Sequence, residues 1–194
     1  MKINIALYCI LALMLISPLA YAQSGTFTKI FSGGSYEEGV KTFRMPDKTY
    51  RIVGNTGTYG WQGTNVWLIA LDSSAQFLWH RAYGEGGIDK AEDAVMDDNG
   101  NIYIVGSSTT MASKAYQFLL MGIDSSGALF TQKYYGGDDW EFGHGITLLN
   151  DSALIMVGET YSYGKGRSDA WVVATNLQGD SLWSKTYGGP EKDA

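Results

Sequence analysis

Cysteine is almost missing from this sequence, since Cys9 is the only one among 194 residues. Cys9 lies in an apolar N-terminal run, so the rest of the chain has no thiol that could form a disulfide, bind zinc or act as a nucleophile. Histidine is also scarce, and His80 and His144 occupy unrelated places, which argues against a zinc site. The chain must therefore be stabilised by packing.

A membrane-spanning run is also lacking. The apolar stretch from Ile5 to Leu19 has 15 residues, fewer than the roughly 20 that a transmembrane helix needs. Lys2 precedes this stretch, and the small residues of Ala20-Tyr21-Ala22 follow it, which is typical of a cleavable signal peptide. We predict a signal peptide at 1–22 and a mature chain, 23–194, that is secreted or held at the cell surface and has no membrane span. An uncleaved anchor is the alternative.

Positive charge is in deficit, with 14 basic and 20 acidic residues and a net charge of −6. No basic stripe is visible, so nucleic acid is excluded as a partner, because binding a polyanion needs clustered lysine and arginine. The motifs G-x-S-x-G and H-E-x-x-H are absent as well. The sequence therefore offers no recognisable nucleophile or metalloprotease site.

What the sequence does contain is a repeat with a period of 52 residues. A shift of 52 aligns four aromatic positions without a gap: Phe31, Tyr83, Tyr135 and Tyr187. The same shift aligns the segments RIVG, YIVG and IMVG, which end at Gly54, Gly106 and Gly158. Several registers with one spacing indicate a domain built from repeats.

Each repeat predicts four short β-strands. A first strand ends in a turn of the type Asp98-Asn99-Gly100, and the second strand carries the xxVG segment. A polar, tyrosine-bearing loop leads to an apolar third strand such as VWLIAL, and a turn such as Ser125-Ser126-Gly127 leads to a fourth such as LFTQKYYG. Four strands in about 50 residues without helical periodicity are typical of a β-propeller blade. We therefore predict an all-β fold with blades at about 39–83, 91–135 and 143–187.

The two ends of the chain look like complementary fragments of another blade. Residues 26–31 resemble a fourth strand without its first three, and residues 188–194 begin a fourth repeat. Closed propellers often assemble one blade from both ends of the chain, and they use about four to eight blades. We therefore expect the remaining blades in a longer chain, as partners of these three.

The fourth strand carries a stripe of side chains on one face. Aromatic residues recur at Phe27, Trp79 and Trp183, with Thr131 in the same column, and a basic residue follows two positions later at Lys29, Arg81, Lys133 and Lys185. Alternation by two places these positions on one side of the strand. We interpret the stripe as packing between adjacent blades, with the basic heads in water.

The segments ALDSSAQFLWHRAYGEGG and SDAWVVATNLQGDSLWSKTYGG resemble the repeats of secreted bacterial β-propellers, the SBBP or YGG type. They are more distantly similar to the tryptophan-docking motif of PQQ quinoprotein propellers, whose vicinal cysteine pair is absent here. Thr131 and Ala75 depart from the pattern, where tryptophan and glycine are usual. The resemblance implies a secreted propeller of seven or eight blades, often in surface proteins exported by type IX secretion, usually without known enzymatic activity.

An acidic residue recurs at the start of each repeat, at Glu37, Asp89, Glu141 and Asp193. One interpretation is structural, with each carboxylate accepting hydrogen bonds in the loop between blades. The other is a calcium site completed by Asp138, Asp139 or loop carbonyls. The structural interpretation is favoured, because no compact calcium-binding loop is present. No other cofactor is expected.

Aromatic residues also gather in loops that propeller topology places on one face. They are Tyr59, Trp61, Tyr116, Tyr161 and Tyr163 between second and third strands, and Trp140 between repeats. Rings beside carboxylates suit stacking on sugars or anchoring a protein, although they could also simply cover the blade ends.

The sequence thus favours a non-enzymatic surface module that binds a glycan or a protein. One alternative is a propeller glycosidase or lyase whose catalytic acids lie partly in other blades. The other is a purely structural repeat domain.

Overall fold

The computed structural model describes residues 29–109, 115–150 and 152–193. It divides into two compact units, Met1–Ile30 and Phe31–Ala194, and the strands of the described residues lie in the second. The predicted signal peptide, 1–22, and residues 26–28 of the predicted strand 26–31 lie outside the described residues. Residues 29–31 lie outside the strands described.

The first four strands form an antiparallel meander in which each strand pairs with the next along the chain. They are β1 (Glu37–Arg44), β2 (Tyr50–Thr56), β3 (Gly63–Leu71) and β4 (Phe77–Tyr83). β3 is buried at nearly every position, as the continuous apolar run VWLIAL predicts for a strand covered on both faces. We call these strands the first meander.

The same pattern follows twice more. The second meander comprises β5 (Gly87–Met96), β6 (Ile102–Thr109), β7 (Gln117–Ile123) and β8 (Leu129–Tyr135). The third comprises β9 (Glu141–Leu149), β10 (Ala153–Thr160), β11 (Asp169–Asn176) and β12 (Ser181–Tyr187). The prediction of an all-β chain with antiparallel pairing is confirmed.

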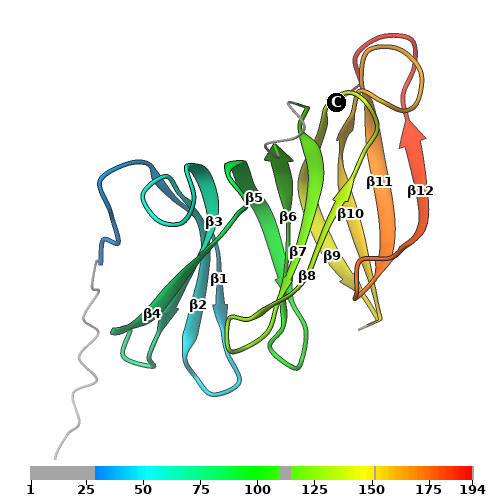
Figure 1. Cartoon of the computed structure of the whole chain (residues 1–194). Coiled ribbons are helices and arrows are strands. Elements are labelled where there is room, and N and C mark those ends of the chain that lie inside the picture. Colours follow the sequence, from blue (N-terminus) through cyan, green and yellow to red (C-terminus); the bar gives the residue numbers. More distant parts are fainter. Residues whose placement is uncertain (1–28, 110–114, 151, 194) are drawn as a thin grey trace, which may run out of the picture. The chain divides into compact units, whose positions relative to one another are not determined.

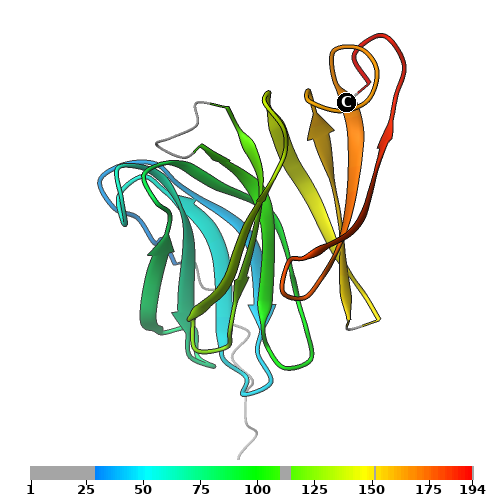
Figure 2. The ribbon, with the colours of Figure 1, turned by 45° about the vertical axis from the view of Figure 1, so that its right-hand side comes forward.

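The three meanders lie next to one another in chain order (Figures 1 and 2). A short parallel contact at Gly63 and Thr64 of β3 joins Gly87 and Ile88 of β5, so the first two meanders share one sheet. The third meander forms a separate sheet, and neither sheet closes on itself. The described residues include no helix long and apolar enough to cross a membrane.

Each first strand is longer than predicted and contains an irregularity. β1, β5 and β9 begin at Glu37, Gly87 and Glu141, ahead of the expected starts at 39, 91 and 143. The pairing register shifts between Gly39 and Lys41 in β1 and between Ala91 and Asp93 in β5. A similar shift occurs in the pairing of β9 with β10. The strands extend beyond these bulges because the ladder resumes on the other side.

The core lies between the meanders. One buried cluster joins residues of β2 and β3 to residues of the second meander, among them Val53, Val66, Leu68, Ile104, Leu119 and Met121. A second cluster joins the second meander to the third, with Val105, Phe118, Leu120, Leu154, Met156 and Trp171. Burial of apolar side chains between sheets therefore holds consecutive meanders together.

The turn before each fourth strand is fixed by one side chain. Oδ1 of Asp124 accepts hydrogen bonds from the backbone N–H groups of Ser126 and Ala128, at 2.8 and 2.9 Å. Asp72 and Asn176 make the corresponding pairs of bonds in the other two meanders. The third turn residue is left-handed each time, with φ of 59°, 84° and 82° at Ala75, Gly127 and Gly179.

Candidate functional site

The recurring acids lie at the start of each first strand and are engaged in local hydrogen bonds. Asp89 is 1% exposed, and its carboxylate accepts a bond from the Ser108 hydroxyl at 2.6 Å and another from the N–H of Glu85 at 3.2 Å. Burial raises the pKa of Asp89, and the bond from Ser108 opposes that rise only in part. Asp89 therefore ties the loop between two meanders to the end of β6.

Glu141 makes the same kind of connection in the third meander. It is fully buried and accepts bonds from the Thr160 hydroxyl at 3.1 Å and from the N–H groups of Ser162 and Gly137, both at 3.2 Å. Ser108 and Thr160 are 52 residues apart, so the sequence repeat extends to the partners of the acids.

Glu37 and Asp193 follow this pattern at the two ends of the described chain. Glu37 accepts bonds from the hydroxyls of Thr58 and Thr56, and the Thr58 bond lowers the pKa of Glu37. Asp193 accepts a bond from the N–H of Gly189. Within residues 29–109, 115–150 and 152–193, no three histidine, aspartate or glutamate side chains are grouped as a metal site would require. The structure does not bring the four calcium candidates together there.

An aromatic cluster surrounds Trp140 in the loop between β8 and β9. The indole lies 6.3 Å from the ring of Tyr116, 6.4 Å from Phe142 and 6.2 Å from Tyr161, with edge-to-face geometry in each pair. Phe142 also lies 4.9 Å from Tyr116. We call these four residues the Trp140 cluster. Edge-to-face contacts of this kind are the favoured arrangement of aromatic rings.

Backbone hydrogen bonds bring the three loops of this cluster together. The N–H of Tyr161 donates to the carbonyl of Trp140, and the N–H of Glu141 donates to the carbonyl of Tyr116, both at 2.9 Å. Phe142 follows in β9. Trp140 remains 48% exposed, while the other three rings are half-buried and support it. The cluster thus presents one indole on a rigid base.

Tyr163 follows Tyr161 by two residues and lies beside a hollow. Its hydroxyl donates to the carbonyl of Gly136 at 2.7 Å, and its ring lies 5.3 Å from Trp171. The hollow measures about 310 Å³ and is lined by Gly137, Asp138, Asp139, Ser162 and Tyr163. Asp138 and Asp139 directly precede Trp140, and Oδ1 of Asp139 accepts a hydrogen bond from the backbone N–H of Trp140 at 3.0 Å.

The two aromatic candidates of the first meander are separate from this cluster. Tyr59 is stacked 5.4 Å from Trp67 and lies 4.5 Å from His80, so it packs into a core cluster. Trp61 is 67% exposed, and its backbone N–H donates to Oδ1 of Asn65. In the described part of the chain, no ring contact joins either residue to Trp140.

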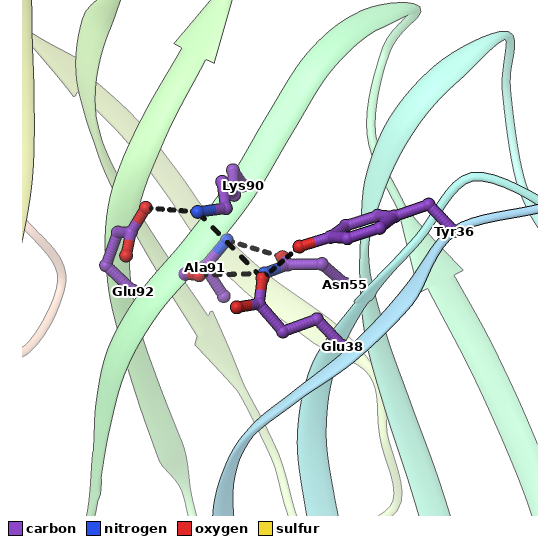
Figure 3. A network of polar contacts seen from close by, with 6 residues as sticks. All are labelled: Tyr36, Glu38, Asn55, Lys90, Ala91 and Glu92. Atoms are coloured by element: carbon purple, nitrogen blue, oxygen red, sulfur yellow. Dashed lines mark hydrogen bonds and ion pairs between the residues drawn. The ribbon is translucent and has the colours of Figure 1, made fainter. Parts of the chain in front are cut away.

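A polar network that the sequence analysis missed connects the first and second meanders (Figure 3). The amide of Asn55 donates to the carbonyl of Ala91 at 3.0 Å and accepts from its N–H at 2.8 Å. Asn55 is fully buried and pairs with β5 as a strand backbone would. Its repeat counterparts, Ser107 and Glu159, differ in chemistry, so the repeat pattern gave no signal for this residue.

Charged groups complete this network near Asn55. Figure 3 shows the hydroxyl of Tyr36 and the amide of Asn55 directed at Oε2 of Glu38, with Lys90 between Glu38 and Glu92. The ammonium of Lys90 lies 2.8 Å from Glu92 and 3.9 Å from Glu38. The hydrogen bond between Tyr36 and Glu38 lowers the pKa of Glu38, and the same bond raises the pKa of Tyr36.

Asp93 links the first strands of all three meanders through an ion pair and a hydrogen bond. Nζ of Lys41 in β1 lies 2.9 Å from Oδ1 of Asp93 in β5. The other carboxylate oxygen of Asp93 accepts a bond from the N–H of Ile146 in β9 at 3.3 Å. Asp93 is therefore paired with a cation through one oxygen and with an amide through the other.

No model of a known protein family matches the chain, and no match is found among curated proteins. The function must therefore be argued from the geometry just described.

Proposed function

We propose that the three meanders are consecutive blades of a secreted bacterial β-propeller that acts, without catalysis, as a carbohydrate-binding module at the cell surface. The signal peptide predicted at 1–22 and the resemblance to secreted propeller repeats support this location and an export route of the type IX kind. The side-by-side stacking of four-stranded antiparallel meanders supports the propeller. A ring needs more than three blades, so further blades of a longer chain would complete it.

The observation that carries the binding proposal is the Trp140 cluster. An exposed indole offers a flat apolar face that matches the C–H face of a sugar ring, and its three supporting rings hold it in place without a ligand. Asp138 and Asp139 precede Trp140 in the chain and line a hollow with Ser162 and Tyr163, where their carboxylates would accept hydrogen bonds from sugar hydroxyls. A rigid ring beside a few polar groups is the usual composition of a small-molecule site.

The glycosidase alternative has less support. A glycosidase needs two carboxyl groups facing the bond to be cleaved, one of them able to protonate a leaving group. Glu38 and Glu92 both face Lys90, and Asp93 is paired with Lys41. Asp89 and Glu141 are buried in loop hydrogen bonds. These acids have structural partners that account for their positions.

Affinity electrophoresis through gels that contain single polysaccharides tests the proposal. We expect at least one polysaccharide to retard the 194-residue chain. Trp140→Ala should weaken this retardation about 30-fold, since a central tryptophan contributes about 2 kcal/mol to binding. Trp61→Ala is the matched control, because Trp61 is an exposed tryptophan outside the cluster, and it should bind as the wild type does.

Two results would contradict the proposal. One is that no polysaccharide in the panel retards the wild-type chain, and the other is that Trp140→Ala migrates as the wild type does. Circular dichroism of each variant shows whether the fold is kept. Reducing-sugar release measured on the same polysaccharides would reveal the enzymatic alternative, and a protein pulled down through Trp140 would indicate the protein-binding one.

A further inference from the structure

One side of the third meander is an apolar surface with no neighbour among the described residues. It is formed by Val157 of β10, Val172 of β11, and Trp183, Lys185 and Tyr187 of β12. We call it the distal face. Val157 is 44% exposed, Trp183 46% and Tyr187 56%. Large apolar groups gathered on one face indicate an interaction site.

The corresponding positions of the first two meanders are covered by the next meander. Val53 and Val105, which precede Val157 by 104 and 52 residues, are fully buried. They belong to the two core clusters that join consecutive meanders. The distal face of the third meander therefore repeats a surface that is used twice within this molecule.

A column of apolar residues at the register shift of each fourth strand provides an internal comparison. Leu78, Phe130 and Leu182 occupy one column of the repeat and are 48%, 45% and 58% exposed. These side chains stay in water even where a following meander is present. The third meander is thus not more exposed at every position, and the difference between Val157 and its counterparts is specific to that column.

In the first two meanders, side chains of the corresponding face make hydrogen bonds to the meander that covers them. The hydroxyl of Tyr83 donates to the carbonyl of Gly127 at 2.7 Å, and Arg81 donates to the same oxygen at 2.5 Å. Tyr135 donates to the carbonyl of Gly179 at 2.6 Å. Each acceptor is the left-handed residue of the turn before the fourth strand of the following meander. Tyr187 is the counterpart of these donors.

Glu159 is the counterpart of a residue that joins two meanders. Its counterpart Asn55 reaches across to the backbone of Ala91 in the next meander. Glu159 is 9% exposed, yet Oε1 accepts no hydrogen bond, and the ammonium of Lys192 is 3.5 Å away. Lys192 gives this oxygen an ion pair, and an N–H from a covering strand would add the hydrogen bond that it lacks.

We infer that the distal face binds a further four-stranded meander of the same kind. Its turn before the fourth strand carries a left-handed glycine whose carbonyl accepts a hydrogen bond from Tyr187, and its first strand offers an N–H to Glu159. The inference rests on the stacking assumed in the proposed propeller, and it does not depend on carbohydrate binding.

The test extends the chain with a meander known to fit such a face. Residues 91–142 are appended after position 194, which continues the 52-residue register and places the counterpart of Ala91 opposite Glu159. Hydroxyl-radical footprinting then compares the extended chain with the 194-residue chain. The oxidation rates of Trp183 and Tyr187 should fall at least about threefold as packing covers side chains that were about half exposed. Leu182 should not change, because its counterpart Phe130 stays 45% exposed although another meander follows it.

The control extension carries Gly127→Val in the appended copy. The native residue has φ of 84°, which strains a β-branched side chain, and a Cβ there would lie 2.7 Å from the indole of the preceding meander. Oxidation of Trp183 and Tyr187 should return to the rate of the 194-residue chain.

Three outcomes would overturn the inference. They are unchanged oxidation of Trp183 and Tyr187 in the extended chain, equal protection by the Gly127→Val extension, and protection of the 194-residue chain that rises with its concentration. The last outcome would assign the face to a second copy. Affinity electrophoresis of both chains runs in parallel, so loss of carbohydrate binding and failure of the added meander to dock are separate results.

Discussion

The hydroxyl of Tyr135 donates a hydrogen bond to the carbonyl oxygen of Gly179, 2.6 Å away, and so joins the second meander to the third. Gly179 accepts this bond because its left-handed conformation, with φ of 82°, turns the carbonyl toward the neighbouring meander. Burial raises the pKa of Tyr135 well above its ordinary value, so this phenol stays protonated and remains a donor.

Removing this hydroxyl should weaken the fold. We expect Tyr135→Phe to lower the free energy of unfolding by about 1 kcal/mol, because it leaves the Gly179 carbonyl without its donor. Urea denaturation followed by tryptophan fluorescence measures the change. Tyr187→Phe is the control, since Tyr187 is 56% exposed and the variant should differ by less than about 0.5 kcal/mol. Equal effects of the two variants would contradict the assigned role.

The side-chain amide of Asn55 should tolerate little change. Asn55→Asp keeps the acceptor for the N–H of Ala91 but sets a carboxylate oxygen against the Ala91 carbonyl, beside Glu38. We expect it to lower the free energy of unfolding by about 2–4 kcal/mol at neutral pH, because it buries a charge and leaves the Ala91 carbonyl without its donor. Asn55→Ser, the residue found at the corresponding Ser107, should lose less. Denaturant midpoints at pH 7 compare the two, and a milder loss in Asn55→Asp would refute the arrangement.

The first glycine of the Tyr-Gly-Gly segment leaves room for the acid of the next strand. A Cβ built at Gly136 would overlap Oε2 of the buried Glu141. Gly136→Ala should therefore destabilise the protein by about 1–3 kcal/mol, as overpacking usually does. Thermal unfolding of Gly39→Ala provides the control, since nothing lies within 4 Å of a Cβ there. A neutral Gly136→Ala would mean that the Glu141 carboxylate can move aside.

The turn at Asp124 should make stability depend on acid. The bond from the Ser126 hydroxyl, aided by backbone N–H groups, lowers the pKa of Asp124 in the folded protein. A carboxyl group whose pKa is lowered by folding stabilises the folded protein at pH values above its ordinary pKa of about 3.9. This contribution is lost as the pH falls through the pKa of the folded state. Asp124→Asn keeps the Oδ1 acceptor, as Asn176 does. We expect it to lose less stability than the wild type between about pH 4 and pH 2.

Urea denaturation at a series of pH values measures this difference. The reverse change, Asn176→Asp in the third meander, should make the free energy of unfolding fall more steeply between about pH 4 and pH 2 than it does in the wild type. Parallel pH profiles for the wild type and Asp124→Asn would contradict the prediction.

Much of the strand pattern could be predicted from the sequence. The turns at Asp72, Asp124 and Asn176 were anticipated because turn residue types act locally through their own backbone. The bulges in the first strands and the network around Asn55 were not anticipated. A bulge changes which side of the sheet a residue faces, and Asn55 has its partner 36 residues away in another meander.

The aromatic candidates were also predicted only in part, because the sequence located them in loops but did not show which of them meet. Tyr59, Trp61, Tyr116, Trp140, Tyr161 and Tyr163 all looked alike in the sequence as loop aromatics. The structure groups Tyr116, Trp140 and Tyr161, adds Phe142 from β9, and packs Tyr59 against Trp67. Phe142 had a signal in its position two residues after Trp140, since alternate strand residues share a face.

The sequence by itself determined the twelve strands of the described chain, their antiparallel order and the turns between them, because periodic apolar residues and turn-forming side chains act over a few positions. Only the tertiary structure decided which side chains meet across meanders. Trp140 owes its rigid exposed position to rings from three different segments, and the exposure of Tyr187 depends on what lies beyond β12. Such contacts depend on how sheets stack, which local sequence does not encode.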